Sequence, residues 1–227
     1  MNFLSEKGVT SYALDLPGHG ERRLEGVIGL GIMDYVSAVE SKASELSLTS
    51  PILVGHSMGG LIVQKYLEKN DATAAVLIAP CPAMGGSLRL LFKYAMRQPI
   101  AGLTATFGRR TAIRDKAMCR RLFFNHISPE SLDSYFAKLC LESSKATRQI
   151  VLPFLKVKAS KIKTTPVAVA AAGKDYFFEF EQLKNWSDEY GYDFLPFPEA
   201  AHNLLCEPEE YGFGKTIYEW LDQKVLT

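Results

Sequence analysis

The sequence predicts an α/β fold, in which a mostly parallel sheet is flanked by helices and a helical insertion interrupts the chain. The first observation is that short apolar runs alternate with stretches of helical spacing, such as 33–46. Strands alternating with helices favour a parallel sheet covered on both faces. The second is the stretch 81–163, which holds several helix-like segments and no convincing strand. The third is size, because 227 residues can bury a large core without disulfides or metals.

Composition narrows the class of protein further. Hydrophobic residues make up 47% of the chain, aromatic residues 11%, and the formal net charge is +1. A mainly disordered chain has few aromatics and a high net charge, so that class is excluded. A protein that binds nucleic acid through its overall charge is also excluded, and we expect no nucleic-acid partner. The length fits one domain, with or without an insertion.

The cysteines and the apolar runs bear on location and cofactors. No C-x-x-C pair occurs among Cys81, Cys119, Cys140 and Cys206, so we expect reduced thiols in a cytoplasmic protein, without a metal or other cofactor. No apolar run approaches the ~18 residues of a membrane span. The first eight residues contain Glu6 and Lys7 and lack an apolar centre, unlike a signal peptide.

The first part of the chain, residues 1–80, contains three predicted strands and two predicted helices. Helices are expected at 33–46 and 58–67, where apolar residues recur at helical spacing. The first of the three apolar runs ends at Pro17-Gly18, and the second leads almost directly into a helix. These runs predict strands at 9–16, 51–54 and 74–79.

The remaining chain divides into an insertion, 81–163, and a return to the core, 164–227. Helical segments are expected in the insertion at 88–96, 113–124, 129–141 and 147–159. The core then contributes an apolar strand at 166–172 and a shorter strand at 194–197. Because the shorter strand is flanked and interrupted by prolines, we expect it to be short or to lie at an edge of the sheet. A last helix is expected over 207–225, with proline in its first turn.

Residues 55–59 read Gly-His-Ser-Met-Gly, the pattern G-x-S-x-G, between a predicted strand and a predicted helix. The bend at such a serine is so sharp that we expect a side chain on either side to clash, which explains Gly55 and Gly59. The turn also places Ser57 at a helix N-terminus, where free N–H groups favour negative charge. The alternative is a glycine-rich turn with an inert serine.

A serine hydroxyl is a weak nucleophile and needs a base held by an acid. His202 follows the last predicted strand and therefore shares the strand-end rim with Ser57. His56 lies within the turn, where we expect it to be unable to reach the serine, and His126 lies in the insertion. His202 is the predicted base; the alternative is a loop histidine packed at a helix start.

The predicted acid is Asp175, which directly follows the strand 166–172 and precedes His202 in sequence. The alternative is an aspartate that caps a helix or stabilises a turn. Asp15 is a weaker candidate, because the prolyl-glycyl turn that follows it explains its presence. Asp188 and Asp193 are also weaker, because they flank or begin a strand and do not end one.

The order Ser57, Asp175, His202 resembles that of the α/β-hydrolase superfamily, whose nucleophile elbow has the same pattern. The likeness covers nearly the whole chain outside the insertion, which corresponds to the family's variable helical cap. It is specific for fold and triad and weakly specific for substrate. The resemblance rests on four stretches. DLPGHG at 15–20 is similar to the turn after the family's fourth strand, and PILVGHSMGG at 51–60 to its nucleophile elbow. GKDY at 173–176 is similar to its acid turn, and HNLLCEP at 202–208 to its histidine loop.

The resemblance implies an α/β-hydrolase fold and acyl transfer to water. Ser57 would attack a carbonyl, His202 would take its proton, and Asp175 would hold the imidazole. The backbone N–H of Met58 would donate to the oxyanion. The implied function is a serine hydrolase of carboxylic esters, esterase-like or lysophospholipase-like, with lipid esters among the candidates. The alternatives are a thioesterase or acyltransferase with the same triad, cofactor-free C–C bond hydrolysis or perhydrolysis, or a non-catalytic or impaired member of the fold.

The family's N-terminal strands have no counterpart in this sequence. Only residues 1–10 are available before the strand predicted at 9–16, counting its first two residues. They resemble the end of the family's first helix. By the resemblance, a second oxyanion donor is expected in a His-Gly pair upstream of the strand predicted at 9–16. This sequence has no His-Gly pair there. We expect Met1 to be an internal methionine of a longer reading frame; the alternative is a truncated descendant. We expect 9–16 either to pair with 51–54 or to leave backbone groups unpaired.

The insertion is strongly basic between residues 89 and 121, where nine basic residues accompany a single acid, Asp115, and many apolar side chains. One interpretation is a cap with its apolar face on the site and its basic residues in solvent. The other is a lid that meets an anionic amphiphile or makes weak contact with a membrane surface. The expected partner is a small-molecule ester, amphiphilic or anionic in the second case.

Overall fold

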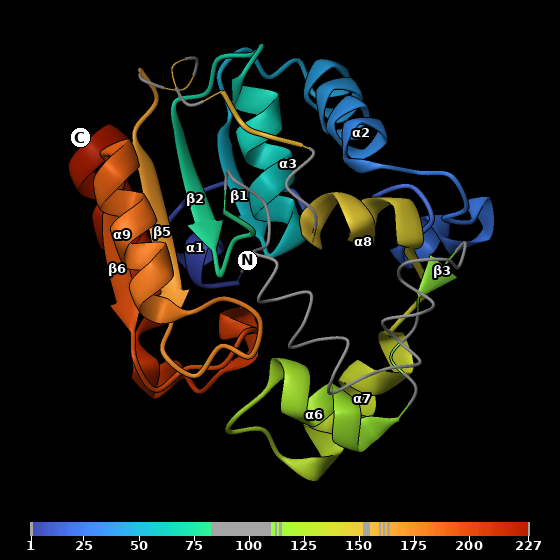
Figure 1. The fold of residues 1–227 in the computed structure, drawn as a ribbon. Helices are drawn as coiled ribbons and strands as arrows, with labels where there is room; N and C mark the ends of the chain where they lie inside the picture. The colour runs from blue at the N-terminus through green and yellow to red at the C-terminus, as the bar shows by residue number, and fades with distance from the viewer. Residues whose placement is uncertain are drawn as a thin grey trace.

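Four parallel strands form the centre of the molecule, with helices on both faces (Figure 1). The structure is a computed structural model that describes residues 2–82, 110–111, 113, 115–151, 155–158, 160, 162 and 164–226. The sheet has the order β1-β2-β5-β6, with β1 Ile52–His56, β2 Ala74–Ile78, β5 Val167–Ala172 and β6 Asp193–Phe197. All four correspond to predicted strands, and β6 lies at the expected edge.

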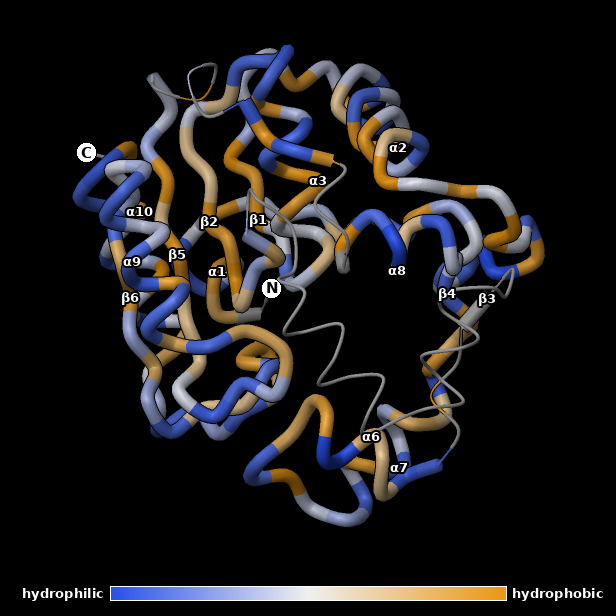
Figure 2. Tube along the Cα trace, in the orientation of Figure 1, coloured by the Kyte–Doolittle hydropathy of each residue, from blue (hydrophilic) through white to orange (hydrophobic). Residues whose placement is uncertain are grey.

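The alternation of side chains along the strands sorts the helices between the two faces. Ala75 and Leu77 of β2 face a core shared with helices α2, α3 and α9. Val76 and Ile78 face the opposite core, which includes α10. Because β2 and β5 are buried on both faces, their sequences are continuous apolar runs (Figure 2). The helices are α2 Ile32–Glu45, α3 Met58–Leu67, α9 Phe180–Tyr190 and α10 Phe213–Leu221.

Residues 9–16 form no strand, so this prediction is wrong. The segment leaves helix α1, Asn2–Glu6, and reaches the turn at Pro17 without joining the sheet. Among the described residues, β1 pairs with β2 alone, so neither 9–16 nor any other segment pairs with its outer edge. An apolar run becomes a strand only where a partner satisfies its backbone. Val54 on β1 is accordingly 49% exposed.

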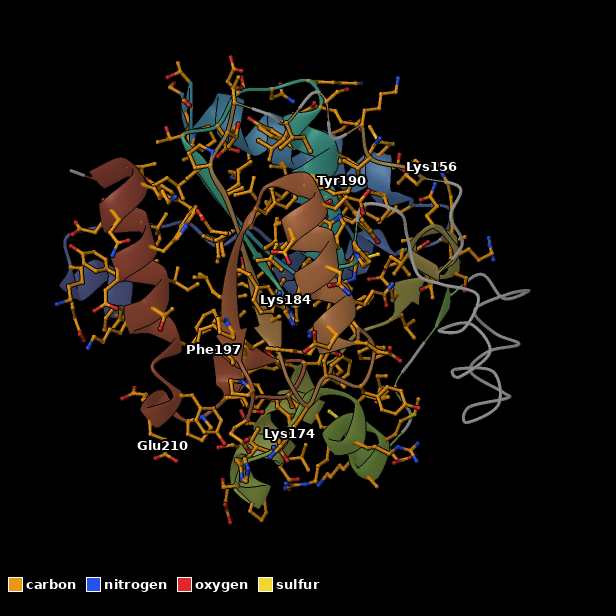
Figure 3. All side chains as sticks on the ribbon, turned by 60° about the vertical axis from the view of Figure 1, so that its left-hand side comes forward. Lys156, Lys174, Lys184, Tyr190, Phe197 and Glu210 are labelled. Atoms are coloured by element: carbon orange, nitrogen blue, oxygen red, sulfur yellow. The ribbon has the colours of Figure 1, made fainter. Side chains whose placement is uncertain are left out.

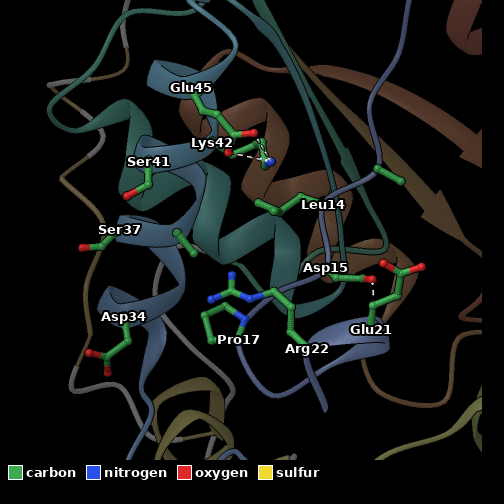
Figure 4. A pocket seen from close by; sticks show the side chains of 12 residues that line it. Leu14, Asp15, Pro17, Glu21, Arg22, Asp34, Ser37, Ser41, Lys42 and Glu45 are labelled. Carbon is green, nitrogen blue, oxygen red and sulfur yellow. Dashed lines mark hydrogen bonds and ion pairs between the residues drawn. The ribbon is translucent and has the colours of Figure 1, made fainter. Parts of the chain in front are cut away.

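A pocket of about 670 Å³ lies between this segment and α2 (Figure 4). Its walls include Leu14 and Pro17 on one side and Ser37 and Ser41 on the other. The two cations in its lining are held by neighbouring carboxylates, in the pairs Arg22–Glu25 and Lys42–Glu45, each with a nitrogen–oxygen distance of 2.7 Å. A short 3-10 helix, η1 Gly20–Glu25, follows the turn.

The insertion forms helices α6 Lys116–Phe123, α7 Pro129–Lys138 and α8 Ser144–Val151. The first two confirm helices expected at 113–124 and 129–141. Their starts have a local cause, because Asp115 and Ser128 cap them by accepting the N–H of Met118 and Ser131. The helix expected at 88–96 lies outside the described residues. The helix expected at 147–159 begins earlier, at Ser144, and is described as far as Val151.

The expectation of no strand in the insertion is also wrong. β3 Arg110–Thr111 pairs antiparallel with β4 Glu142–Ser143. A ladder of two residues on each side is too short to leave an alternating pattern in the sequence, since such patterns need about four residues or more. The pair therefore depends on tertiary contacts that local sequence does not specify.

The C-terminal part differs from prediction in two places. The helix expected over 207–225 is divided into a 3-10 turn, η4 Glu209–Tyr211, then α10, then a π-helical turn, η5 Asp222–Leu226. Gly212, at φ 65°, separates the first two. Helix α9 was not predicted. Among the described residues no helix combines the length and apolarity of a membrane span, and the longest, α2, has 14 residues.

Candidate active site

Ser57 lies on the bend between β1 and α3, at the carboxyl end of the sheet. Its backbone has φ 54° and ψ −115°, a strained conformation for a residue with a side chain. Its N–H donates to the carbonyl of Ile78 at 2.9 Å, and its own carbonyl accepts from the N–H of Gly60 at 3.0 Å and of Cys81 at 3.1 Å. These three bonds tie the bend to β2 and to the start of α3.

The glycines around the serine have different causes. A Cβ on Gly55 would lie 2.3 Å from the carbonyl oxygen of Gly59, so a side chain there would clash. A Cβ on Gly59 would meet no described atom within 4 Å. The prediction that a side chain would clash is therefore confirmed at Gly55 and wrong at Gly59. The second close approach is at Gly60, whose Cβ would lie 2.5 Å from Cβ of Pro80.

Asp175 lies in the turn that follows β5. Its Oδ1 accepts the backbone N–H groups of Phe177 at 2.7 Å and Phe178 at 3.2 Å, which sets the orientation of the carboxylate. The turn touches the loop after β6, because a Cβ on Gly173 would lie within 2.1 Å of the Pro198 carbonyl oxygen. This close approach requires glycine. Lys174, in the turn of Asp175, and Phe197, the last residue of β6, are labelled in Figure 3.

His202 lies in that loop and connects the other two predicted residues. Its Nδ1 is 2.8 Å from Oδ2 of Asp175, and its Nε2 is 2.9 Å from Oγ of Ser57. The side chains of His202 and Asp175 are 1% and 0% exposed. A carboxylate only accepts hydrogen bonds, so Nδ1 carries the hydrogen and Nε2 is left to accept from the hydroxyl. The structure thus brings all three side chains into one hydrogen-bonded chain.

The weaker candidates have other contacts. Asp15 accepts the N–H of Glu21 at 3.0 Å, which supports its interpretation as a turn residue. Asp188 pairs with Lys184 at 3.1 Å and Asp193 with Lys224 at 2.9 Å. His126 is exposed and lies edge-on to Tyr211, with ring centroids 6.2 Å apart.

Aromatic side chains that the sequence analysis missed surround the imidazole of His202. The ring centroid of Phe177 lies 4.6 Å from that of His202, and those of Phe123 and Phe178 lie 5.9 Å away. Phe123 belongs to α6 of the insertion, and its carbonyl accepts the N–H of Asn203 at 2.9 Å. Phe177 and Phe178 could have been noticed from their place after Asp175, whereas nothing in the sequence points to Phe123.

His56 also contacts His202, although it does not bond to the serine oxygen. Its Nε2 is 2.9 Å from the backbone carbonyl oxygen of His202, and the two rings are 4.9 Å apart. Burial and the neighbouring His202 lower the pKa of His56 to about 4. The sequence gives no signal for this contact, because His56 and His202 lie far apart in the chain.

Met58, the predicted oxyanion donor, is the first residue of α3. The first N–H groups of a helix have no partner within the helix, and no described residue accepts the N–H of Met58, so this amide can meet an anion beside Ser57. In the part of the chain that the structure describes, no three His, Cys, Asp or Glu side chains gather as metal ligands would.

Comparison with known proteins now identifies the family. A model of the alpha/beta hydrolase family matches residues 1–210. The chain belongs to the alpha/beta hydrolase family. It is 29% identical over 228 residues to the AB hydrolase superfamily protein YisY of Bacillus subtilis (strain 168), covering 92% of this chain and 81% of that protein.

Solved structures agree with the family at the level of the fold. An extracellular alpha/beta-hydrolase from a Paenibacillus species matches with a TM-score of 0.73 and 18% identity, covering 99% of this chain and 90% of the other. A monoacylglycerol lipase of Paleococcus ferrophilus matches with a TM-score of 0.66 and 20% identity, covering 98% and 87%. The predicted α/β-hydrolase fold is confirmed. In this α/β hydrolase, the carboxyl ends of β1, β5 and β6 lead to Ser57, Asp175 and His202.

Proposed function

We propose that this α/β hydrolase cleaves carboxylic esters through an acyl-enzyme on Ser57. The supporting observation is the continuous chain of hydrogen bonds, 2.9 Å from Ser57 Oγ to His202 Nε2 and 2.8 Å from His202 Nδ1 to Asp175 Oδ2. A base within this distance of a hydroxyl, itself oriented by an acid, is the arrangement that activates a serine.

In the first half of the reaction, Ser57 Oγ attacks the ester carbonyl while its proton moves to Nε2 of His202. The imidazolium that forms keeps its Nδ1–H on the Asp175 carboxylate, which stabilises the new charge. The N–H of Met58 donates to the oxyanion of the tetrahedral intermediate. His202 then gives its proton to the leaving alkoxide, and the acyl group stays on Ser57.

In the second half, His202 takes a proton from water, and the hydroxide attacks the acyl carbon. The proton returns to Ser57 Oγ as the carboxylic acid leaves. Both halves use the same base and the same oxyanion donor. The proposed cycle runs on proton transfer and covalent catalysis by side chains, without a metal or cofactor.

The surroundings of His202 favour an ester with an apolar part. Phe123, Phe177 and Phe178 lie around the imidazole, and Met118 and Leu122 of α6 pack with Phe177 in the same cluster. Apolar walls gain free energy when they bury an alkyl or aromatic group. We therefore propose a small-molecule ester with an apolar acyl chain, lipid and lysophospholipid esters included. The basic stretch 89–121 would suit an anionic headgroup or membrane surface, and most of it lies outside the described residues.

The test is labelling with a fluorophosphonate, followed by intact mass, because this reagent reacts with an activated serine irrespective of substrate. We expect one adduct on the protein and none on Ser57→Ala. A control variant, Ser37→Ala on the exposed side of α2, should label like the parent. A folded parent that takes no adduct, or a Ser57→Ala variant that still does, contradicts the proposal. p-Nitrophenyl esters of two to twelve carbons, beside matching thioesters, then identify the acyl chain and the bond.

A further inference from the structure

His56 occupies an unusual place, because it is the last residue of β1 and the neighbour of the nucleophile. Its side chain reaches the backbone of the opposite side of the site. Nε2 lies 2.9 Å from the carbonyl oxygen of His202. A carbonyl only accepts, so Nε2 carries the hydrogen and donates it. One bond therefore joins the nucleophile's strand to the backbone of the base's loop.

The loop of His202 has few anchors of its own. Residues 198–203 contain no helix or strand. In the described structure, the acid turn holds the carbonyl of Ala200 through the N–H of Lys174 at 2.9 Å. The insertion holds the carbonyl of Glu199 through Nδ2 of Asn125 at 3.1 Å, and the N–H of Asn203 through the carbonyl of Phe123 at 2.9 Å. These three anchors come from elements other than the one bearing Ser57. The His56 bond adds a connection from the strand of the nucleophile to the backbone of His202, beside the bond between the His202 and Ser57 side chains.

Charge explains why a histidine suits this position. The rings of His56 and His202 are 4.9 Å apart, and His202 must become positive when it takes the serine proton. A charged donor at this distance would oppose that step by repulsion. Burial and His202 keep the pKa of His56 near 4, so the ring donates while neutral. Lysine or arginine would donate equally well but would add a positive charge.

We infer that His56 is a positioning residue, which holds the backbone of His202 so that Nε2 faces Ser57 and Nδ1 faces Asp175. This inference rests on the proposed function. The hydrogen bond acts through geometry alone: His56 does not touch the reacting atoms and exchanges no proton in the cycle. A misplacement of a catalytic group by about 1 Å can cost ~100-fold in rate.

The experiment compares His56→Met with His56→Gln, two side chains of similar length of which only glutamine can donate. Active sites are counted by fluorophosphonate titration, so that kcat is expressed per reactive serine. We expect His56→Met to lose about 10- to 100-fold in kcat with little change in KM, and His56→Gln to recover most of the loss.

The control variant is His126→Phe, which removes an exposed histidine of the insertion and should leave kcat unchanged. Equal kcat per site in His56→Met and the parent overturns the inference, and so does an equal loss in His56→Met and His56→Gln. If His56→Met does not fold, His56→Phe replaces it; if neither folds while His56→Gln does, the bond is a requirement of the fold and the inference fails. A parent that takes no label contradicts the proposed function instead.

Discussion

At the scale of single residues, Asp175 uses both oxygens of its carboxylate in different directions. Oδ1 accepts two backbone N–H groups of its own turn, and Oδ2 faces His202 Nδ1. In Asp175→Asn, the amide oxygen keeps the turn, and the amide nitrogen then presents hydrogens to Nδ1. His202 would adopt the other tautomer, with a hydrogen on Nε2 that blocks acceptance of the serine proton. We expect a folded variant whose kcat falls by about 10⁴, measured with a p-nitrophenyl ester.

The matched control for this change is Asp188→Asn, which alters an exposed i,i+4 pair with Lys184 on α9. Its kcat should equal that of the parent, and its stability should change by about 0.5 kcal/mol or less. If Asp175→Asn kept more than a tenth of the parent's kcat, the orienting role of Asp175 would be wrong.

The elbow glycines provide a second prediction at this scale. A Cβ on Gly55 meets backbone at 2.3 Å, whereas one on Gly59 meets nothing described within 4 Å. Gly55→Ala should therefore lower the free energy of unfolding by about 1–3 kcal/mol through overpacking. Gly59→Ala, in the first turn of α3, should leave it unchanged or raise it by up to ~1 kcal/mol, because alanine favours the helix. Urea denaturation measures both, and an equal loss in the two variants contradicts the explanation.

At the scale of elements, a hydrogen-bonded cluster joins the insertion to the core. Glu142 of β4 accepts from the hydroxyl of Tyr35 on α2 at 2.9 Å, and its other oxygen is 3.1 Å from Nε2 of His19. Nδ1 of His19 is 3.0 Å from the carbonyl of Pro17. Both nitrogens of His19 thus face acceptors, and the imidazolium satisfies both.

This cluster makes the junction sensitive to pH. The hydrogen bond to Glu142 raises the pKa of His19 above its usual 6.5, against the opposing effect of burial, and Asp15 adds to the rise. A raised histidine pKa stabilises the folded state fully below the unfolded value, and the stabilisation is lost as pH rises through the folded value. We expect amide exchange in 142–148 to speed up as pH increases above about 6.5, after correction for intrinsic exchange.

Two variants separate this effect from other causes. Glu142→Gln removes the carboxylate that raises the pKa, so the pH dependence of local stability should flatten. Tyr35→Phe removes one hydrogen bond to Glu142 and leaves the His19 contact in place, so the junction should weaken while its pH dependence stays. A pH dependence that survives in Glu142→Gln would assign it to another group.

The elements show where sequence reasoning succeeds and where it stops. β2 and β5 were predicted within a residue because burial on both faces forces continuous apolar runs such as Val167–Ala172. Residues 9–16 are also rich in apolar side chains but pair with no described strand, and a local pattern does not report whether a partner is present. β3 and β4 are too short to leave a pattern. Helix α9 was within reach, since Phe180, Leu183 and Trp186 follow helical spacing.

The residues of the candidate site also fall into those that the sequence predicts and those that it does not. Ser57 could be chosen from its G-x-S-x-G pattern. Asp175 and His202 could be chosen because each lies in the turn or loop after a predicted strand, and the carboxyl ends of parallel strands share one rim. Phe123 could not, because its approach to His202 depends on how the insertion folds back over the sheet. The contact of His56 with His202 joins residues 146 positions apart in the chain, and only the three-dimensional structure reveals it.

At the scale of the whole molecule, hydrogen bonds of the described residues tie the insertion to different parts of the core, and three of these ties bear on the site and its surroundings. The Glu142 cluster is the first, and the bond between Phe123 and Asn203 is the second. The third is at α3, where Glu68, in a buried pair with Lys65, accepts the N–H of Lys158 at 2.7 Å. The second tie ends one residue from His202, so the insertion holds the backbone beside the proposed base. If the proposed ester binds beside His202, its acyl chain should therefore contact α6.

Phe123→Ala tests this dependence. The ring lies 5.9 Å from His202 and 5.8 Å from Phe177, so its removal takes apolar surface from beside the base, while the backbone bond to Asn203 remains. We expect kcat/KM for p-nitrophenyl octanoate to fall about 10-fold, as the loss of apolar contact with a long acyl chain predicts. The acetate ester has no chain to contact the ring, so its kcat/KM should stay within about threefold, since that factor corresponds to less than 1 kcal/mol.

Phe136→Ala is the matched control, because Phe136 belongs to the same insertion and packs in the cluster of Cys119 and Leu132. It should lower stability and leave the ratio of octanoate to acetate rates unchanged. An equal fall for both esters in Phe123→Ala would mean that the ring acts on His202 itself. No fall for either ester would mean that the acyl chain binds away from α6. Only a selective loss with octanoate places the acyl chain between the insertion and the rim of the sheet.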